Sequence, residues 1–499
     1  MKIFSAAQIK NGDLFTIKNE PIASVHLMEK AAMACTDFIH HKYLKTQNIL
    51  IFCGHGNNGG DGLAMARLLY QKGFDVDVFM DKSKKDFSKD AEINYHRLKE
   101  FLGIRILDFT DFNEGFINED SIIVDALFGT GLNRKIEGEI AKIILKLNQI
   151  HVHKIAIDIP SGVLADGNIP ENGVVFKADE TLSLQFCKQS FLHPEISEYC
   201  GKIHILEIGI SKKYIENTET PHYIIDEEIV RKIYKKRKDT SHKGNYGKTC
   251  IVAGSFGKIG AAVLATKSAL FSGSGLTYIL APKCGYEILQ TTCPEAMYLY
   301  GGEDFIKNFT VENDFTYGIG PGLGTDYETE EKLMHFLKNY NEPLVLDADA
   351  LNLISKNSEN LNLIPKKSII TPHPKEFSRL FGESKDSFER LELAKSKAKE
   401  LNIYIVLKGH HTQIITPEGN VFYNITGNSG LAKGGSGDVL LGIITSFLAQ
   451  GYSPENAAIF GVWLHGKAAD FTAEKYSKEA MLASDVIQHI GEVFKYLQK

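Results

Sequence analysis

The loop NITGNSGLAKGGSGDVLLG, residues 424–442, places one carboxylate, Asp438, at the end of a glycine-rich run and just ahead of an apolar segment. Glycines allow a backbone to approach a ligand closely and to adopt positive φ. A helix start presents unpaired N–H groups and the positive end of a dipole, which together bind anions. The pattern therefore favours an anion site beside Asp438, and the alternative is a loop that only needs turns.

Acids and a hydroxyl also end two apolar runs in the first half. Asp125 in VDALFGTGLNR precedes a glycine turn that closes with Arg134, and Asp158 in IDIPSG is followed by Ser161. An amide oxygen, a carboxylate and a hydroxyl at adjacent strand ends can bind a hard cation. The GTGLNR turn can hold a phosphate through backbone N–H groups and a guanidinium.

The segment CGHGNNGGDG, residues 53–62, lies between a predicted strand and a predicted helix. This context is typical of a phosphate or dinucleotide turn, although the segment is not the GxGxxG fingerprint. Asn57 and Asn58 supply amide oxygens. Asp61 either contacts a ligand or caps the helix, since acids are common at helix starts.

Four further motifs follow in the second half. GPGLG ends a strand with three glycines, and DADALN offers Asp347 and Asp349, one of which caps the next helix in the simplest interpretation. TPHPKEF fixes His373 between two prolines, which restrict the loop. LKGHHT places Lys408 and Thr412 around a turn that can contact a nucleotide.

These motifs need a framework of strands whose ends meet. Short apolar runs predict strands at 47–54, 74–80, 120–129, 153–162, 179–186 and 203–209, and again at 247–255, 276–282, 317–324, 343–351, 368–377 and 403–412. Helical segments alternate with them, beginning with 61–73 and 259–275. The alternation predicts parallel sheets with right-handed crossovers. Ligands of such sheets bind beyond the carboxyl ends of the strands, so two series of strands predict two sites.

Composition limits the class of protein. A chain of 499 residues is too long for one ordinary core, and two domains joined near 210–228 are expected. The net charge of −6 does not call for nucleic acid, and the basic stretch 236–249 is either a solvated face or a phosphate contact. Seven scattered cysteines fit reduced thiols. We expect no signal peptide and no membrane span.

The first half resembles the NAD(P)H-hydrate epimerase domain through GNNGGDG, VDALFGTGL and DIPSG, which occur in order and at strand ends. The resemblance implies a Rossmann-like three-layer α/β/α domain over residues 1–220, with K⁺ bound through Asn58, Asp125 and Ser161. Asp158 becomes the acid/base candidate for interconverting the R and S hydrates, or else a hydrogen-bonding anchor. The implied substrate contacts are Asn57, Asn58, Gly59, Gly60, Asp61, Gly129, Thr130, Gly131, Leu132, Asn133, Arg134, Lys135 and Asp158.

The second half resembles the ADP- or ATP-dependent NAD(P)H-hydrate dehydratase domain through SHKGNYG, AGSFGKIGAA, GPGLG, DADALN, TPHPKEF, LKGHHT and GNSGLAKGGSGD. It implies a ribokinase-like α/β/α domain over residues 221–499, with ADP as the phosphoryl donor and Mg²⁺ as countercharge. Asp438 becomes the base that activates the hydrate hydroxyl. The implied substrate contacts are Ala262, Gly322, His373 and Asp438. The implied nucleotide contacts are Lys408, Gly409, His410, His411, Thr412 and Gly437.

The chain departs from the family pattern in a few places. Lys375 stands where the family commonly has glycine in TPHPGE, and the GNPGMATGGTGD segment differs at Ser429, Leu431, Lys433 and Ser436. Lys433 adds a positive charge next to the expected anion site. It either assists phosphate binding or points to solvent.

The resemblance implies a cytoplasmic bifunctional repair enzyme that epimerises hydrated NADH or NADPH and dehydrates the S form. We expect a homo-oligomer that binds small molecules and neither nucleic acid nor a membrane. One alternative is a ribokinase-like kinase for a small metabolite, fused to a dinucleotide-binding module. A second is a non-catalytic N-terminal module that senses dinucleotides or contacts a partner protein.

Overall fold

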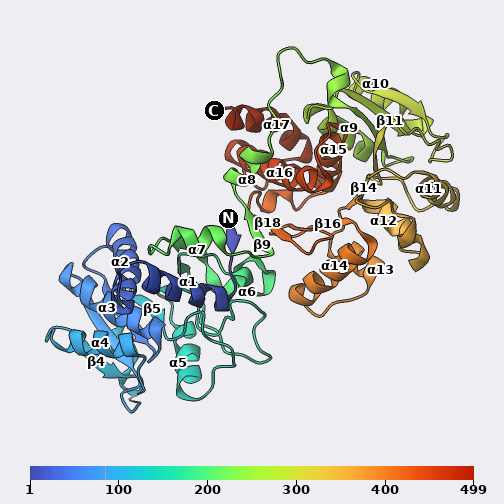
Figure 1. The fold of residues 1–499 in the computed structure, drawn as a ribbon. Coiled ribbons are helices and arrows are strands. Elements are labelled where there is room, and N and C mark those ends of the chain that lie inside the picture. Colours follow the sequence, from blue (N-terminus) through green and yellow to red (C-terminus); the bar gives the residue numbers. More distant parts are fainter. Residues whose placement is uncertain (85) are drawn as a thin grey trace. The chain divides into compact units, whose positions relative to one another are not determined.

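The computed structural model describes residues 1–84 and 86–499 (Figure 1). Contacts divide the chain into two compact units, an N-terminal unit of Lys2–Thr220 and a C-terminal unit of Pro221–Lys499 together with Met1. Each unit contains its own sheet and its own core.

The N-terminal unit is built on a parallel sheet of order β4-β3-β2-β5-β6-β7-β8. Its strands are β2 (Asn48–Cys53), β3 (Asp75–Met80), β4 (Arg105–Asp108), β5 (Ile122–Ala126), β6 (His153–Ile157), β7 (Glu180–Leu184) and β8 (Lys202–Leu206), after a short β1 (Lys2–Ile3). Its helices are α1 (Ala6–Asn19), α2 (Ser24–Lys42), α3 (Asn57–Gln71), α4 (Lys89–Lys99), α5 (Gly138–Gln149), α6 (Pro194–Cys200) and α7 (Lys212–Asn217), with 3₁₀ turns η1 (Phe109–Asp111), η2 (Glu114–Phe116) and η3 (Gln189–Leu192).

Both faces of this sheet are covered, as in a three-layer α/β/α fold. Along β2, Ile49 and Ile51 belong to the core shared with α3, whereas Leu50 and Phe52 belong to the core shared with α5. This alternation follows from the two-residue period of a strand, and burial on both sides explains why the strands are continuous apolar runs. The strand order reverses between β2 and β5, which is the position where open α/β sheets bind ligands.

The C-terminal unit contains the sheet order β9-β18-β17-β16-β15-β14-β13-β10-β11-β12. Its strands are β9 (His222–Ile225), β10 (Lys248–Val252), β11 (Leu276–Ala281), β12 (Met297–Tyr300), β13 (Thr316–Ile319), β14 (Val345–Leu346), β15 (Ile369–Ile370), β16 (Tyr404–Leu407), β17 (Gln413–Ile415) and β18 (Val421–Asn424). Its helices are α8 (Glu227–Ile233), α9 (Ile259–Phe271), α10 (Tyr286–Thr292), α11 (Tyr327–Asn339), α12 (Ala348–Ile354), α13 (Pro374–Phe381), α14 (Ser387–Leu401), α15 (Ser436–Ala449), α16 (Pro454–Tyr476) and α17 (Ala483–Leu497). The 3₁₀ turns are η4 (Lys243–Tyr246), η5 (Lys283–Gly285), η6 (Ser358–Leu363) and η7 (Ser429–Leu431).

Helices α9, α15, α16 and α17 pack together within one core (Figure 1). A Cβ on Gly442 would lie 2.1 Å from the Ala265 carbonyl oxygen, so the close approach of α15 to α9 requires glycine there. This contact fixes the start of α15 beside the carboxyl ends of the central strands.

The two-domain α/β prediction is confirmed, with three local differences. Helix α3 begins at Asn57 rather than at residue 61. Strand β17 runs antiparallel to β16, because the five-residue loop 408–412 is too short for a parallel crossover. Six strands within the described residues were not predicted, and each has four residues or fewer: β1, β4, β9, β12, β17 and β18.

Candidate active sites

A buried polar cluster links three strand ends of the N-terminal unit. The Asp125 carboxylate accepts hydrogen bonds from the Ser161 hydroxyl and amide, both at 2.7 Å, and from the Leu127 amide at 3.1 Å. The Asn58 side chain donates to the Phe128 carbonyl at 3.0 Å, while the buried Asn58 Oδ1 has no hydrogen-bond partner in the described chain. Burial raises the pKa of Asp125 to about 6 against the opposing effect of the Ser161 hydrogen bonds. The cluster therefore contains a buried oxygen, Asn58 Oδ1, that can still accept a hydrogen bond or bind a cation.

Asp158 lies at the end of β6 with a left-handed backbone, φ 67°. Its Oδ2 accepts from the Thr130 amide at 3.2 Å, and its Oδ1 accepts from the Leu184 amide at 3.3 Å and from the buried ammonium of Lys188. A Cβ on Gly129 would lie 3.3 Å from Asp158 Oδ2 and 3.2 Å from Asn58 Cβ. The glycine turn after β5 therefore brings Asp158 and the NNGGD segment next to one another.

Two further carboxyl groups, those of Asp61 and Asp13, are close enough to Asp158 for its charge to affect their pKa values. Burial, followed by the charge of Asp158, raises the pKa of Asp61 well above its usual range and that of Asp13 to about 6. Asp61 is the fifth residue of α3, so the alternative that it caps this helix is wrong. The same helix start requires Gly59, whose Cβ would lie 1.9 Å from the Gly54 carbonyl oxygen.

Several further residues of the predicted epimerase site are exposed. Asn57 is exposed at the start of α3, and in the turn after β5 Arg134 and Lys135 are exposed. Gly131 is exposed too, with no atom within 4 Å of an added Cβ. Exposed amide, guanidinium and ammonium groups are donors of the kind that bind a phosphate.

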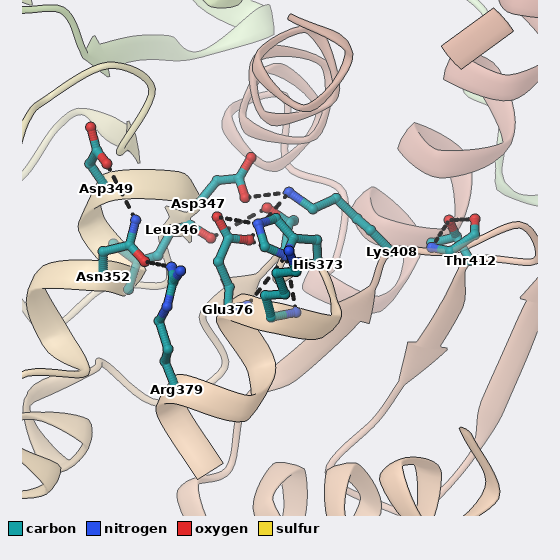
Figure 2. A network of polar contacts seen from close by, with 12 residues as sticks. Leu346, Asp347, Asp349, Asn352, His373, Glu376, Arg379, Lys408 and Thr412 are labelled. Atoms are coloured by element: carbon teal, nitrogen blue, oxygen red, sulfur yellow. Dashed lines mark hydrogen bonds and ion pairs between the residues drawn. The ribbon is translucent and has the colours of Figure 1, made fainter. Parts of the chain in front are cut away.

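In the C-terminal unit the first turn of α15 faces a partly buried lysine, Lys408. Lys408 Nζ lies 2.7 Å from Asp347 Oδ1 and 3.8 Å from Glu376 Oε2 (Figure 2). Burial acts to lower the pKa of Lys408, but Asp347 and Glu376 outweigh it, so the pKa is raised. A Cβ on Gly437 would lie 3.2 Å from Asp347 Oδ2 and 3.4 Å from Lys408 Nζ. The helix start and the ammonium therefore border one small space.

Asp438 borders the same space from the first turn of α15. Burial, and then the charge of Asp347, raises the pKa of Asp438 to about 6, although Lys408 opposes the shift. A carboxyl group with a pKa near the working pH is suited to general base catalysis. Gly435 caps the helix with φ 96°, a conformation that favours glycine, and no side chain caps α15. The first N–H groups of α15 have no side-chain cap to satisfy them.

His373 caps α13 and is bound to Glu376. Its Nδ1 accepts from the amides of Lys375 and Glu376 at 3.1 and 3.3 Å, and its own amide donates to Glu376 Oε2 at 2.8 Å. Because Nδ1 is an acceptor, the neutral ring carries its proton on Nε2, which lies 3.4 Å from Glu376 Oε1. Figure 2 shows His373, Glu376 and Lys408 side by side, with Thr412 beyond Lys408 on the hairpin loop.

A separate group of contacts organises the GPGLG turn. Ser255 donates to the Gly322 carbonyl at 2.8 Å, and Asp349 accepts from the Gly324 amide at 2.8 Å and from Lys258 Nζ at 3.2 Å. Gly322 has φ 64° and borders Lys258. Ala262 is fully buried below this turn, so its side chain offers no accessible surface to a ligand.

The hairpin loop 408–412 carries the other nucleotide candidates. Gly409 and His410 are exposed, and Thr412 Oγ1 donates to the Gly409 carbonyl at 3.2 Å. The His410 and His411 rings lie 4.3 Å apart. The pKa of His411 is lowered to about 4, mainly by burial and to a smaller extent by the charge of His410.

Lys433 is exposed, and its ammonium contacts the backbone before α17. Its ammonium donates to the carbonyl of Met481 at 2.9 Å and to that of Glu479. It therefore ties the glycine-rich loop to the segment before α17. Asp470 of α16 holds the other end of the loop through the Gly427 amide and the Asn428 side chain, both at 3.0 Å.

Several residues in these clusters were absent from the predicted sites. Lys188 and Asp13 lie in the N-terminal cluster. Asp347 was noted only as a possible helix cap and makes no capping hydrogen bond, and Glu376 was not singled out. His465 of α16 is buried, and burial followed by Lys408 lowers its pKa to about 4. An acid at a strand end was the available signal for Asp347, whereas nothing local pointed to Lys188.

Comparisons with known proteins match a different family model to each of the two units. The family model described as NAD(P)H-hydrate dehydratase matches residues 249–492, and the one described as YjeF-related protein N-terminus matches residues 24–190. A Moorella thermoacetica protein named bifunctional NAD(P)H-hydrate repair enzyme is 33% identical over 100% of this chain and 98% of its own length. The chain belongs to the family of bifunctional NAD(P)H-hydrate repair enzymes.

Other relatives extend the comparison. The Escherichia coli protein named as a bifunctional NAD(P)H-hydrate repair enzyme is 32% identical over 98% of this chain and 93% of its own. A crystal structure of the ADP/ATP-dependent NAD(P)H-hydrate dehydratase of Bacillus subtilis, co-crystallised with ATP/Mg²⁺, aligns with a TM-score of 0.50 and 33% identity, covering 55% of this chain and 98% of that one. Among the described residues, no helix has the length and apolar character needed to cross a membrane.

Proposed function

We propose that this family member epimerises the R and S forms of hydrated NADH and NADPH and dehydrates the S form with ADP. Residues 1–220 would perform the first reaction and residues 221–499 the second. The observation that carries the proposal is the full-length similarity to repair enzymes, together with one cluster of buried acids at strand ends in each matched region.

In the epimerase domain, the chemistry needs a group that moves protons at the hydroxyl-bearing carbon. Asp158 is the candidate, because its carboxylate lies at the end of β6 beside the glycine turn and the NNGGD segment. The hydrate would lie against residues 57–61 and 129–135, where exposed donors of the turn meet its phosphates. Asp158 takes the hydroxyl proton as the C=O bond forms and the bond between this carbon and the ring nitrogen breaks, and the nitrogen takes up a proton. Attack of the nitrogen on the other face of the carbonyl, with the protons returned, gives the other epimer.

The residues present fit a potassium ion. The unpartnered buried Oδ1 of Asn58, the buried carboxylate of Asp125 and the hydroxyl of Ser161 are the oxygen donors a hard cation prefers. When bound, K⁺ would supply positive charge that holds these strand ends together and attracts the anionic cofactor. Asp125 would remain the fixed negative partner because Ser161 and Leu127 already donate to it.

In the dehydratase domain, ADP would lie along Lys408–Thr412 with its terminal phosphate at the start of α15. The N–H groups of residues 435–437 and the Lys408 ammonium would hold this phosphate. Asp438 takes the proton of the hydrate hydroxyl as its oxygen forms a bond to phosphorus, and the bond from phosphorus to the nucleotide breaks. The new phosphate ester then leaves with the C–O electrons, and loss of a proton from the adjacent ring carbon restores the dihydronicotinamide.

Magnesium would supply countercharge to the nucleotide phosphates in this domain. The buried carboxylates of Asp347 and Glu376 are oxygen donors of the kind that Mg²⁺ uses beside phosphates. His373 and Gly322 would border the hydrate.

The cysteines bear on the compartment in which the protein works. Free thiols at all seven cysteines fit a reducing cytoplasm.

An absorbance assay tests the proposal. The S hydrate with ADP should recover the dihydronicotinamide band, and the R hydrate should recover it at a rate limited by epimerisation. Separate runs with ADP and ATP establish the phosphoryl donor. A chain that consumes ATP with a sugar or vitamin precursor and leaves both hydrates unchanged would be a plain metabolite kinase instead.

A further inference from the structure

A fully buried ammonium lies behind Asp158. The side chain of Lys188 has 0% exposure, and its Nζ donates to Asp158 Oδ1, to the Ser183 hydroxyl at 2.8 Å and to the Leu184 carbonyl at 3.4 Å. These three acceptors use all three N–H groups of the ammonium. Lys188 therefore has no surface with which to contact a substrate.

The two oxygens of Asp158 have different surroundings. Oδ1 is occupied by Lys188 and by the Leu184 amide. Oδ2 faces the turn after β5, where it accepts one hydrogen bond from the Thr130 amide at 3.2 Å. The φ of 67° at Asp158 is unfavourable for a residue other than glycine and persists only where its surroundings fix it. The carboxylate is thus held in one orientation, with Oδ2 toward the proposed substrate turn.

The neighbouring acids lack such a partner. In the described chain, neither Asp61 nor Asp13 forms an ion pair with a lysine or arginine. Burial and the charge of Asp158 raise the pKa of both carboxyl groups. Among these three carboxyl groups, Lys188 contacts only that of Asp158.

We infer that Lys188 is a positioning residue for epimerisation: it binds Oδ1 of Asp158 and holds the carboxylate in one orientation, so that Oδ2 exchanges the proton with the hydrate. This inference rests on the proposed epimerase function. Lys188 acts only through Asp158, since it is sealed from the substrate side. Without the ammonium, Oδ1 would lose its ion-pair partner, and Oδ2 would lose its fixed direction.

The test uses the full chain with Lys188→Met, which keeps the length of the side chain and removes its charge. We expect kcat for the R hydrate to fall about 100-fold, the lower range for loss of acid–base catalysis, with KM changed by less than about threefold. Dehydration of the S hydrate by the same protein should be unchanged. Lys154→Met is the matched control, because Lys154 is also a buried lysine but lies at the start of β6, at the other end of the strand from Asp158, and donates to the Ile150 and Val152 carbonyls.

A double variant separates positioning from a merely structural role. If Lys188 acts through Asp158, Lys188→Met should cause no further loss of kcat in an Asp158→Asn background. An additional loss there, or a kcat within threefold of wild type for the single variant, would overturn the inference while leaving wild-type epimerisation intact. Absence of epimerisation in the wild type would instead overturn the proposed function.

If the Lys188→Met protein does not fold, Ser183→Ala tests the positioning role of Lys188 instead. This substitution keeps the ammonium and removes one of its three acceptors. We expect a loss of kcat of about tenfold with an unchanged KM, as one hydrogen bond to a charged group is lost. An unchanged kcat in a folded Ser183→Ala protein overturns the positioning role.

Discussion

Gly437→Ala should separate the anion site at α15 from the stability of the helix. Gly437 is the second residue of α15, and its φ is not among the positive values, so alanine fits the backbone. The added methyl carbon would lie 3.2 Å from Asp347 Oδ2 and 3.4 Å from Lys408 Nζ. These contacts are tight but tolerable, and we expect the protein to fold.

The methyl group would occupy space that the phosphate needs. A phosphate oxygen bound to an ammonium lies about 2.8 Å from the nitrogen, so an oxygen shared by Lys408 and the α15 start would collide with this methyl. Loss of one hydrogen bond to a charged group costs about 1.5 to 3 kcal/mol. Since 1.36 kcal/mol is tenfold in rate, we expect kcat/KM for ADP in dehydration of the S hydrate to fall about 10- to 100-fold.

Stability should change little or rise. Alanine is favoured over glycine in a helix by up to about 1 kcal/mol, which offsets the tight contact. Gly491→Ala is the matched control, since Gly491 lies in α17, is exposed and has no atom within 4 Å of an added Cβ. A Gly437→Ala protein that melts like the control and keeps kcat/KM for ADP within twofold of wild type would refute the anion site.

Three other outcomes are expected. Dehydration of the S hydrate should slow as the pH falls below about 6, because the raised pKa of Asp438 leaves the carboxyl group protonated there; a rate that is constant across this range would exclude Asp438 as the base. Lys433→Ala should leave the dehydration rate unchanged and lower the free energy of unfolding in urea by about 1 kcal/mol, because two carbonyls lose a donor. Ser161→Ala should raise the K⁺ concentration for half-maximal epimerisation about tenfold, measured with tetramethylammonium holding ionic strength constant, and an unaltered K⁺ response would argue against this ion site.

The sequence predicted most of what depends on local order. Apolar runs that close with Asp125, Asp158 or GPGLG predict the carboxyl ends of strands, because glycines and acids favour the turns that follow a buried strand. The parallel layers follow from the alternation of strands and helices. It missed short strands and the antiparallel β17, whose direction depends on the five-residue loop that returns the chain.

The tertiary structure decided which charges meet. Lys408 and Asp347 are 61 residues apart, and Lys188 and Asp158 are 30 apart. No spacing in the chain predicts these pairs, because each depends on the order of strands in the sheet. The sequence by itself determined that acids and glycines stand at strand ends. Only the folded sheet determined that the ammonium groups of Lys188 and Lys408 each face a particular carboxylate, because a charge is removed from water at low cost only beside an opposite charge.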